Sequence, residues 1–168
     1  METAIPLCIP DICSWNESSQ QYIRPTQIHT ERDSLIVVDA ARRRLRAING
    51  PVCVVTIAGP CRKGKSFILS KVFGQGEVFP LGHLFDPETM GIWMWVVPQK
   101  FTDRNGREFT VVLLDSEGTN AVTAENRDDH KIFTLSVLLG SVLIYNSAGV
   151  PNRTDLEGLE YPFDQKLP

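Results

Sequence analysis

The sequence predicts an α/β fold of the P-loop NTPase type, a mainly parallel sheet flanked by helices. Three observations lead to it: an apolar run at 52–58, a glycine-rich loop at 59–64, and a helical segment from Lys65. Continuous apolar runs are typical of strands buried on both faces, as in parallel sheets covered by helices. A chain of 168 residues, 42% hydrophobic and 22% charged, is long enough for one such domain.

Charge and hydropathy exclude several other classes of protein. Lys and Arg number 17 against 20 Asp and Glu, and the formal net charge of −3 gives no electrostatic basis for binding nucleic acid. No apolar run approaches the roughly 18 residues needed to cross a bilayer, and no signal-peptide pattern opens the chain. We therefore expect a cytoplasmic protein without a transmembrane segment, whose cysteines stay reduced.

The elements before the loop are short. Residues 1–30 have little periodicity and several prolines, so we expect an extended leader there and the domain proper over 31–168. Residues 35–38 are mostly β-branched and predict a strand. Asp39 is then expected to N-cap a helix ending near Ile48, whose arginines face solvent.

The elements after the loop alternate between helix and strand. Asn105-Gly106 is a strong hairpin signal between two apolar strands. Trp93 and Trp95 are two residues apart on the first of these strands, so they share a face, and packing is favoured over stacking on a base. The expected elements are helices at 65–73 and 128–139, strands at 92–98, 108–114 and 141–145, and a short helix near 155–161.

Residues 59–66, GPCRKGKS, fit the phosphate-loop pattern G-x-x-x-x-G-K-[ST] at every fixed position. Gly59 and Gly64 allow the backbone to turn so that N–H groups point at phosphate oxygens. Lys65 supplies an ammonium for the β- and γ-phosphates, and Ser66 a hydroxyl for Mg²⁺. The loop follows a predicted buried strand and opens a helix, which is the context that such a motif requires.

A second motif, D-x-x-G, ends the strand at 108–114. Asp115 is predicted to hold Mg²⁺ through water, and Gly118 to offer its backbone N–H to the γ-phosphate. Thr89 is the one threonine between Ser66 and Ile92. It is a candidate ligand of Mg²⁺ and the γ-phosphate, the alternative being an ordinary loop threonine.

Together these motifs resemble the guanylate-binding proteins, within the dynamin-like large GTPases that include the atlastins. The matching stretches are GPCRKGKSFILSKVFG at 59–74, ETMGIWMWVVP at 88–98, VVLLDSEGT at 111–119 and FTLSVLLGSVLIYNSAG at 133–149. The resemblance implies that GTP is the substrate, that Mg²⁺ is the cofactor and that GDP is a product. It also implies a nucleotide-dependent dimer, with itself or with relatives, paired through the nucleotide face.

The resemblance assigns further roles. Arg62 matches an arginine finger acting in cis, Glu117 a glutamate in the water network around the γ-phosphate, and Thr89 the first-switch threonine. No residue matches a general base. The implied catalytic residues are Arg62, Lys65, Thr89 and Glu117; the implied nucleotide-binding residues are Gly59, Arg62, Lys63, Gly64, Lys65, Ser66, Phe67, Thr89, Asp115 and Gly118. Mg²⁺ would be held by Ser66, Thr89 and, through water, Asp115.

Two departures from the family pattern favour an alternative function. Pro87 replaces a serine that helps to position the attacking water, and no Arg-Asp pair for reading guanine follows Asn146. We therefore expect a partial GTPase domain without its last strands, with weak guanine selectivity, an exposed apolar edge at 141–145, and membrane contact only through absent C-terminal regions. The alternative is a truncated, weakly or non-hydrolysing interaction module that associates with full-length relatives. A P-loop kinase or ATPase is a third candidate; the hairpin strand, Thr89 and the D-x-x-G motif argue against a kinase.

Overall fold

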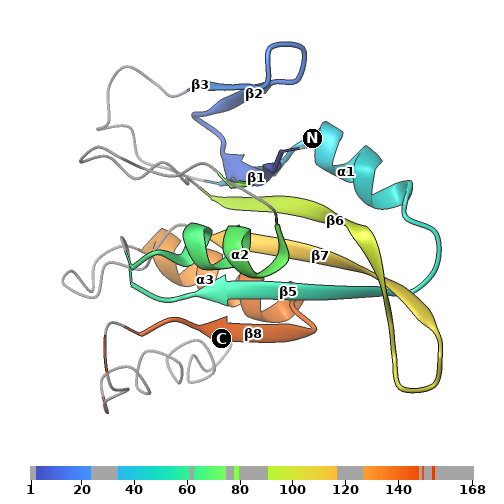
Figure 1. Ribbon diagram of the computed structural model, residues 1–168. Helices are drawn as coiled ribbons and strands as arrows, with labels where there is room; N and C mark the ends of the chain where they lie inside the picture. Colours follow the sequence, from blue (N-terminus) through green and yellow to red (C-terminus); the bar gives the residue numbers. More distant parts are fainter. Residues whose placement is uncertain are drawn as a thin grey trace, which may run out of the picture.

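A six-stranded sheet forms the centre of the fold (Figure 1). The computed structural model describes residues 3–23, 34–60, 63–74, 78–79, 91–116, 127–147, 149 and 153. In these residues the strand order is β4-β1-β6-β7-β5-β8, and β2 and β3 form a separate two-stranded sheet. The strands are β1 (Ile5–Pro10), β2 (Ser14–Asn16), β3 (Gln21–Ile23), β4 (Leu35–Val37), β5 (Val52–Ala58), β6 (Ile92–Thr102), β7 (Glu108–Ser116) and β8 (Val142–Tyr145).

The α/β class is as predicted, but the sheet is mixed where the sequence predicted a mainly parallel one. β5 pairs in parallel with β7 and β8, whereas β6 pairs antiparallel with β7 and β1, and β1 with β4. The short turn between β6 and β7 is one physical reason, since parallel neighbours need a long crossover. At this turn the Asp103 carboxylate accepts hydrogen bonds from the N–H groups of Asn105 and Arg107, both at 2.8 Å.

The first strand is part of the sheet, although its sequence was expected to form an extended leader. β1 lies between β4 and β6, and the side chains of Ile5 and Ile9 are fully buried. The register with β6 shifts between Pro6 and Cys8, as at a β-bulge. Such an irregularity accommodates a residue that cannot donate to the ladder, which explains why the prolines do not prevent pairing.

Among the described residues, three helices flank the sheet: α1 (Asp39–Arg46), α2 (Lys65–Phe73) and α3 (Arg127–Leu139). Figure 1 shows α2 and α3 on opposite faces. The predicted capping role of Asp39 is wrong, because Val38 occupies the N-cap position and no side chain caps the helix. Asp39 lies in the first turn instead, where its carboxylate is 3.4 Å from the guanidinium of Arg42.

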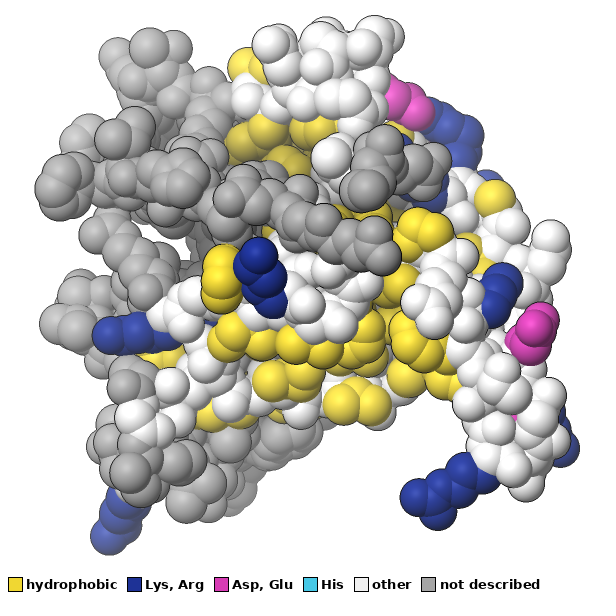
Figure 2. Space-filling view, viewed as in Figure 1, with side chains coloured by type: hydrophobic (Ala, Val, Ile, Leu, Met, Phe, Trp, Pro, Cys, Tyr) yellow, Lys and Arg dark blue, Asp and Glu magenta, His cyan; other side chains and the backbone are white. Residues whose placement is uncertain are grey.

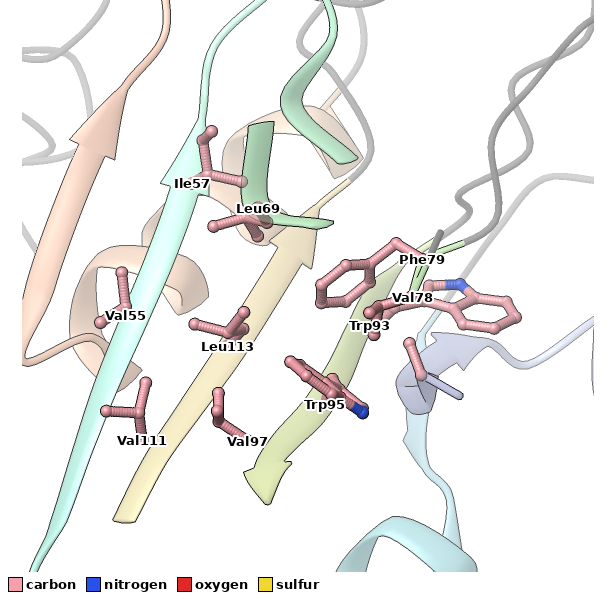
Figure 3. Packing of buried hydrophobic residues seen from close by; sticks show 11 residues of the cluster. Val55, Ile57, Leu69, Val78, Phe79, Trp93, Trp95, Val97, Val111 and Leu113 are labelled. Atoms are coloured by element: carbon pink, nitrogen blue, oxygen red, sulfur yellow. The ribbon is translucent and has the colours of Figure 1, made fainter. Parts of the chain in front are cut away.

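Strand alternation places one main cluster of buried residues on each face of the sheet, and a small third cluster contains Ile9 and Cys13. On the α2 side, Trp93 and Trp95 pack with Leu69 of α2 (Figure 3), so both tryptophans lie in the core as predicted. The Trp93 ring makes edge contacts with Trp15 and Tyr22, with centroids 5.8 Å apart in each pair. The opposite cluster contains Ile5, Cys8, Ala40, Ala41, Ile92, Met94, Val112, Leu114 and Ile132.

β8 is the last strand of the sheet among the described residues, and part of its apolar surface faces solvent. Val142 and Leu143 are 48% and 37% exposed. Figure 2 shows hydrophobic side chains along the sheet beside α2 on the face in view. In the same part of the chain, no helix is long and apolar enough to cross a membrane. The predicted short helix near 155–161 lies outside the described residues.

Gly91, at the start of β6, gives a testable prediction about stability. Its φ is +76°, and a Cβ added there would lie 2.2 Å from the carbonyl oxygen of Cys8 on β1. We expect Gly91→Ala to lower the free energy of unfolding by about 2 kcal/mol, from backbone strain and displacement of β1. Gly106→Ala is the matched control, because Gly106 has a φ of +77° but open space around it. Urea denaturation measures both variants, and equal losses would show that the contact with Cys8 is unimportant.

Candidate functional site

The predicted phosphate loop connects the end of β5 to the start of α2. Gly59 has a φ of +137° and Gly64 a φ of +77°, both in the region that favours glycine. Gly64 occupies the N-cap position of α2, so the loop ends where the unpaired N–H groups of the helix begin. A helix N-terminus of this kind favours anions, since its N–H groups and dipole both attract negative charge.

The side chain of Lys65 is held inside this loop. It is 6% exposed, and its Nζ donates a hydrogen bond to the carbonyl oxygen of Pro60 at 3.0 Å. Burying an ammonium is costly unless it has compensating partners. The arrangement therefore keeps a positive charge at the loop, in the place where the motif requires it.

Asp115 and Ser66 meet beside this lysine. Alternation along β7 puts Asp115 on the same face as Leu113, the face that α2 covers. The Ser66 hydroxyl donates to Oδ2 of Asp115 at 2.5 Å. The strand ends thus bring a hydroxyl of α2 and a carboxylate of β7 together across 49 residues of sequence.

Burial dominates the electrostatics of Asp115. Its side chain is fully buried, and this burial raises its pKa from 3.8 to about 6. The hydrogen bond from Ser66, the charge of Lys65 and a backbone hydrogen bond from Ser116 oppose the rise. Within the described part of the chain, Oδ1 of Asp115 is buried and has no hydrogen-bond partner. Buried acceptors without partners are rare, and groups with perturbed pKa values cluster at functional sites.

These groups fit a magnesium ion. Mg²⁺ prefers oxygen ligands and is commonly held by one or two carboxylates together with substrate phosphates and water. Oδ1 of Asp115 is a buried oxygen that lacks a partner, and the Ser66 hydroxyl lies next to the same carboxylate. The described residues contain no group of three or more His, Cys, Asp or Glu that could hold a metal. Phosphates and water would therefore have to supply the remaining ligands.

The other predicted site residues are less enclosed or lie outside the described ranges. Lys63 is exposed, and its carbonyl oxygen accepts a hydrogen bond from the Asn146 side chain. Phe67 is 50% exposed on α2, with Nζ of Lys71 5.5 Å from its ring centroid. Four predicted residues, Arg62, Thr89, Glu117 and Gly118, lie outside the described residues.

Asn146 contacts the loop, although no specific role was predicted for it within the family-like stretch at 133–149. Its backbone N–H donates to the carbonyl oxygen of Ala58 at 2.8 Å, and its Nδ2 donates to that of Lys63 at 2.7 Å. Its position directly after the predicted strand at 141–145 was the available signal, since parallel strands end at the same edge of a sheet. The hydrogen-bond partners themselves, 83 residues apart for the side-chain bond, could not be read from local pattern.

A glycine-bounded loop between a buried strand and a helix, followed directly by a lysine and a serine, is characteristic of the P-loop class of α/β folds. A family profile described as "Guanylate-binding protein, N-terminal domain" matches residues 32–165. The chain belongs to the guanylate-binding protein family.

Three relatives illustrate the similarity. The chain is 42% identical over 135 residues to guanylate-binding protein 3 of Homo sapiens, covering 80% of this chain and 22% of that protein. It is 43% identical over 128 residues to guanylate-binding protein 2 of Rattus norvegicus, covering 76% and 21%. It is 42% identical over 135 residues to guanylate-binding protein 1 of Mus musculus, covering 80% and 22%. The chain thus spans about a fifth of the length of these curated relatives.

Proposed function

We propose that this chain binds GTP together with Mg²⁺ at residues 59–66 and Asp115, and hydrolyses it to GDP and phosphate. The observation that carries the proposal is the cluster of Lys65, Ser66 and Asp115, in which a buried carboxylate oxygen lacks a partner. Membership of the guanylate-binding family supports guanine nucleotides as the ligand class. A cytoplasmic location is part of the same proposal.

The proposed contacts to phosphate come from described residues. Lys65 offers its ammonium to the β- and γ-phosphates, while the first N–H groups of α2 and the loop backbone donate to phosphate oxygens. Ser66 and Asp115 are the proposed ligands of Mg²⁺. When bound, the ion would offset the negative charge of the phosphates. Gly59 and Gly64 hold the loop in the backbone conformation that this requires.

The roles of four further residues in hydrolysis rest on the resemblance of their motifs. Arg62 is proposed to stabilise the negative charge that develops on the phosphates, an effect worth about 10³–10⁵ in rate in other GTPases. Thr89 is proposed to contact Mg²⁺ and the γ-phosphate, Glu117 to order the attacking water, and Gly118 to donate its N–H to the γ-phosphate. The water attacks in line with the leaving GDP. Pairing of two chains through the nucleotide face is proposed on the same grounds.

Two observations favour a second candidate, a non-hydrolysing interaction module that associates with longer relatives. Pro87 stands where the family pattern has a serine and offers no hydroxyl to the attacking water. The exposed side chains of Val142 and Leu143 give β8 an apolar surface at the end of the sheet, which suits pairing with another chain.

A titration with fluorescently labelled GTP, GDP and ATP, in Mg²⁺ and in EDTA, tests the proposal. We expect saturable micromolar binding of GTP that strengthens with Mg²⁺, with release of phosphate on incubation. Binding without phosphate release would favour the interaction module. No detectable binding of any nucleotide at millimolar concentration would contradict nucleotide binding itself.

A further inference from the structure

Asn146 contacts the phosphate loop at both of its ends. At the first end, its N–H donates to the Ala58 carbonyl, and its own carbonyl oxygen lies 2.2 Å from where a Cβ on Gly59 would be. At the second end, its side-chain Nδ2 donates to the carbonyl oxygen of Lys63. One residue after β8 therefore connects the start of the loop to the peptide before Gly64.

The two ends depend on Asn146 in different ways. The bond to Ala58 uses the backbone, as any residue at this position could, and continues the pairing of β8 with β5. The bond to Lys63 uses the side-chain amide, which a side chain without a correctly placed donor could not replace. The specificity for asparagine therefore lies at the second end.

The side-chain bond fixes the orientation of the Lys63–Gly64 peptide. This peptide is planar and trans, so its carbonyl and its N–H point in opposite directions. While the carbonyl accepts from Asn146, the N–H of Gly64 points away from it. Rotation of the peptide would exchange the two groups and would turn a carbonyl oxygen toward the side where a phosphate loop needs a donor.

We propose that Asn146 is a positioning residue that holds the Lys63–Gly64 peptide with its N–H available to the nucleotide's phosphates. The proposal rests on the proposed function for its ligand, a guanine nucleotide. It adds that the residue after β8 controls the shape of the loop through its side chain. Asn146 acts through the loop backbone and is not itself a contact to phosphate.

The test compares three variants of Asn146 with a control variant at the next residue, Ser147. Asn146→Ala removes the donor, Asn146→Asp keeps the shape but offers no donor at neutral pH, and Asn146→His places an Nδ1–H at the same number of bonds from Cα. Ser147→Ala is the control, because the Ser147 hydroxyl donates to the carbonyl oxygen of Gly149 and not to the loop.

Two measurements distinguish an effect on the loop itself from an effect on nucleotide binding. The first is the rate of trypsin cleavage after Lys63 in the nucleotide-free chain, measured by mass spectrometry, because the carbonyl of that bond is the acceptor. The second is the affinity for labelled GDP. We expect Asn146→Ala and Asn146→Asp to raise the cleavage rate and weaken GDP binding, each by about three- to tenfold, the range that loss of one hydrogen bond predicts. Asn146→His should restore much of both, and Ser147→Ala should change neither.

Each outcome decides the proposal. Unchanged cleavage and affinity in Asn146→Ala and Asn146→Asp would overturn it, even if the wild-type chain binds nucleotide. Equal defects in all four variants would also overturn it, because they would indicate general loosening of the segment after β8. Faster cleavage in the alanine and aspartate variants, with rescue by histidine, would support positioning of the loop. If the wild-type chain then bound no nucleotide, the proposed function would fail while the positioning role stood.

Discussion

Lys65→Ala is expected to weaken binding of GTP and GDP by about 100-fold while the chain stays folded. The Lys65 ammonium is almost fully buried at the loop and donates to the Pro60 carbonyl, so it is already positioned for an incoming phosphate. Removing one partner of a buried, charge-assisted interaction costs about 2–5 kcal/mol, and about 3 kcal/mol corresponds to a 100-fold change in affinity.

The fold should tolerate this change because the core does not depend on the lysine. The residues of α2 that pack on the sheet, such as Leu69, are unchanged, and removal of a buried charge also removes its desolvation cost. Lys71→Ala is the matched control, since it removes the same charge from an exposed position on the same helix. Nucleotide affinity comes from titration and folding from circular dichroism. A folded Lys65→Ala variant that bound GTP as tightly as the control would show that residues 59–66 are not the phosphate site.

The local sequence pattern predicted the elements on either side of the phosphate loop. The strand at 52–58 and the helix at 65–73 have the predicted bounds, because the apolar run and the flanking glycines are strong local signals. The position of β1 could not be predicted in the same way. Its pairing with β4 and β6 depends on partners distant in sequence, and its prolines contradict a strand by propensity alone. Tertiary contacts therefore decided the sheet order.

The candidate site also contains features that the sequence predicted and features that depend on tertiary packing. The sequence indicated that Ser66 and Asp115 would approach each other, because Ser66 follows the loop after β5 and Asp115 lies near the end of β7. The complete burial of Asp115 and its unpartnered Oδ1 depend on how α2 packs over β7, which no local pattern contains. The same holds for Asn146, whose side-chain bond joins segments that no motif links.

Asp115→Asn is expected to stabilise the nucleotide-free chain at pH 7.5, although it should remove the response to Mg²⁺. In the folded chain the pKa of Asp115 is about 6, against 3.8 for an ordinary aspartate. Between these two values the folded state binds more protons than the unfolded state, so stability falls as pH rises from about 4 to about 6. Above that window the ionised carboxylate costs about 3 kcal/mol, because burial outweighs its favourable contacts. An asparagine cannot ionise and avoids this cost.

Urea denaturation at pH 5 and pH 7.5, in EDTA and in Mg²⁺ with GDP, measures these effects. The wild-type chain should lose stability between pH 5 and pH 7.5 in EDTA and regain it with Mg²⁺ and GDP, since a ligand that binds only the folded state stabilises it. Asp115→Asn should show a smaller pH dependence and little gain from Mg²⁺ beyond that from GDP alone. Asp39→Asn, which removes an exposed carboxylate at the start of α1, is the matched control.

A variant less stable than wild type at both pH values would contradict this account. It would mean that Ser66, Lys65 and the Ser116 backbone compensate fully for the burial of the carboxylate. The carboxylate would then be structural, and its unpartnered oxygen would need another explanation. A more stable variant that no longer responds to Mg²⁺ would instead show that the folded chain keeps a destabilising buried charge, which the metal and the phosphates offset on binding. Stability and function would then oppose each other at one residue, as expected of a site formed before its ligand arrives.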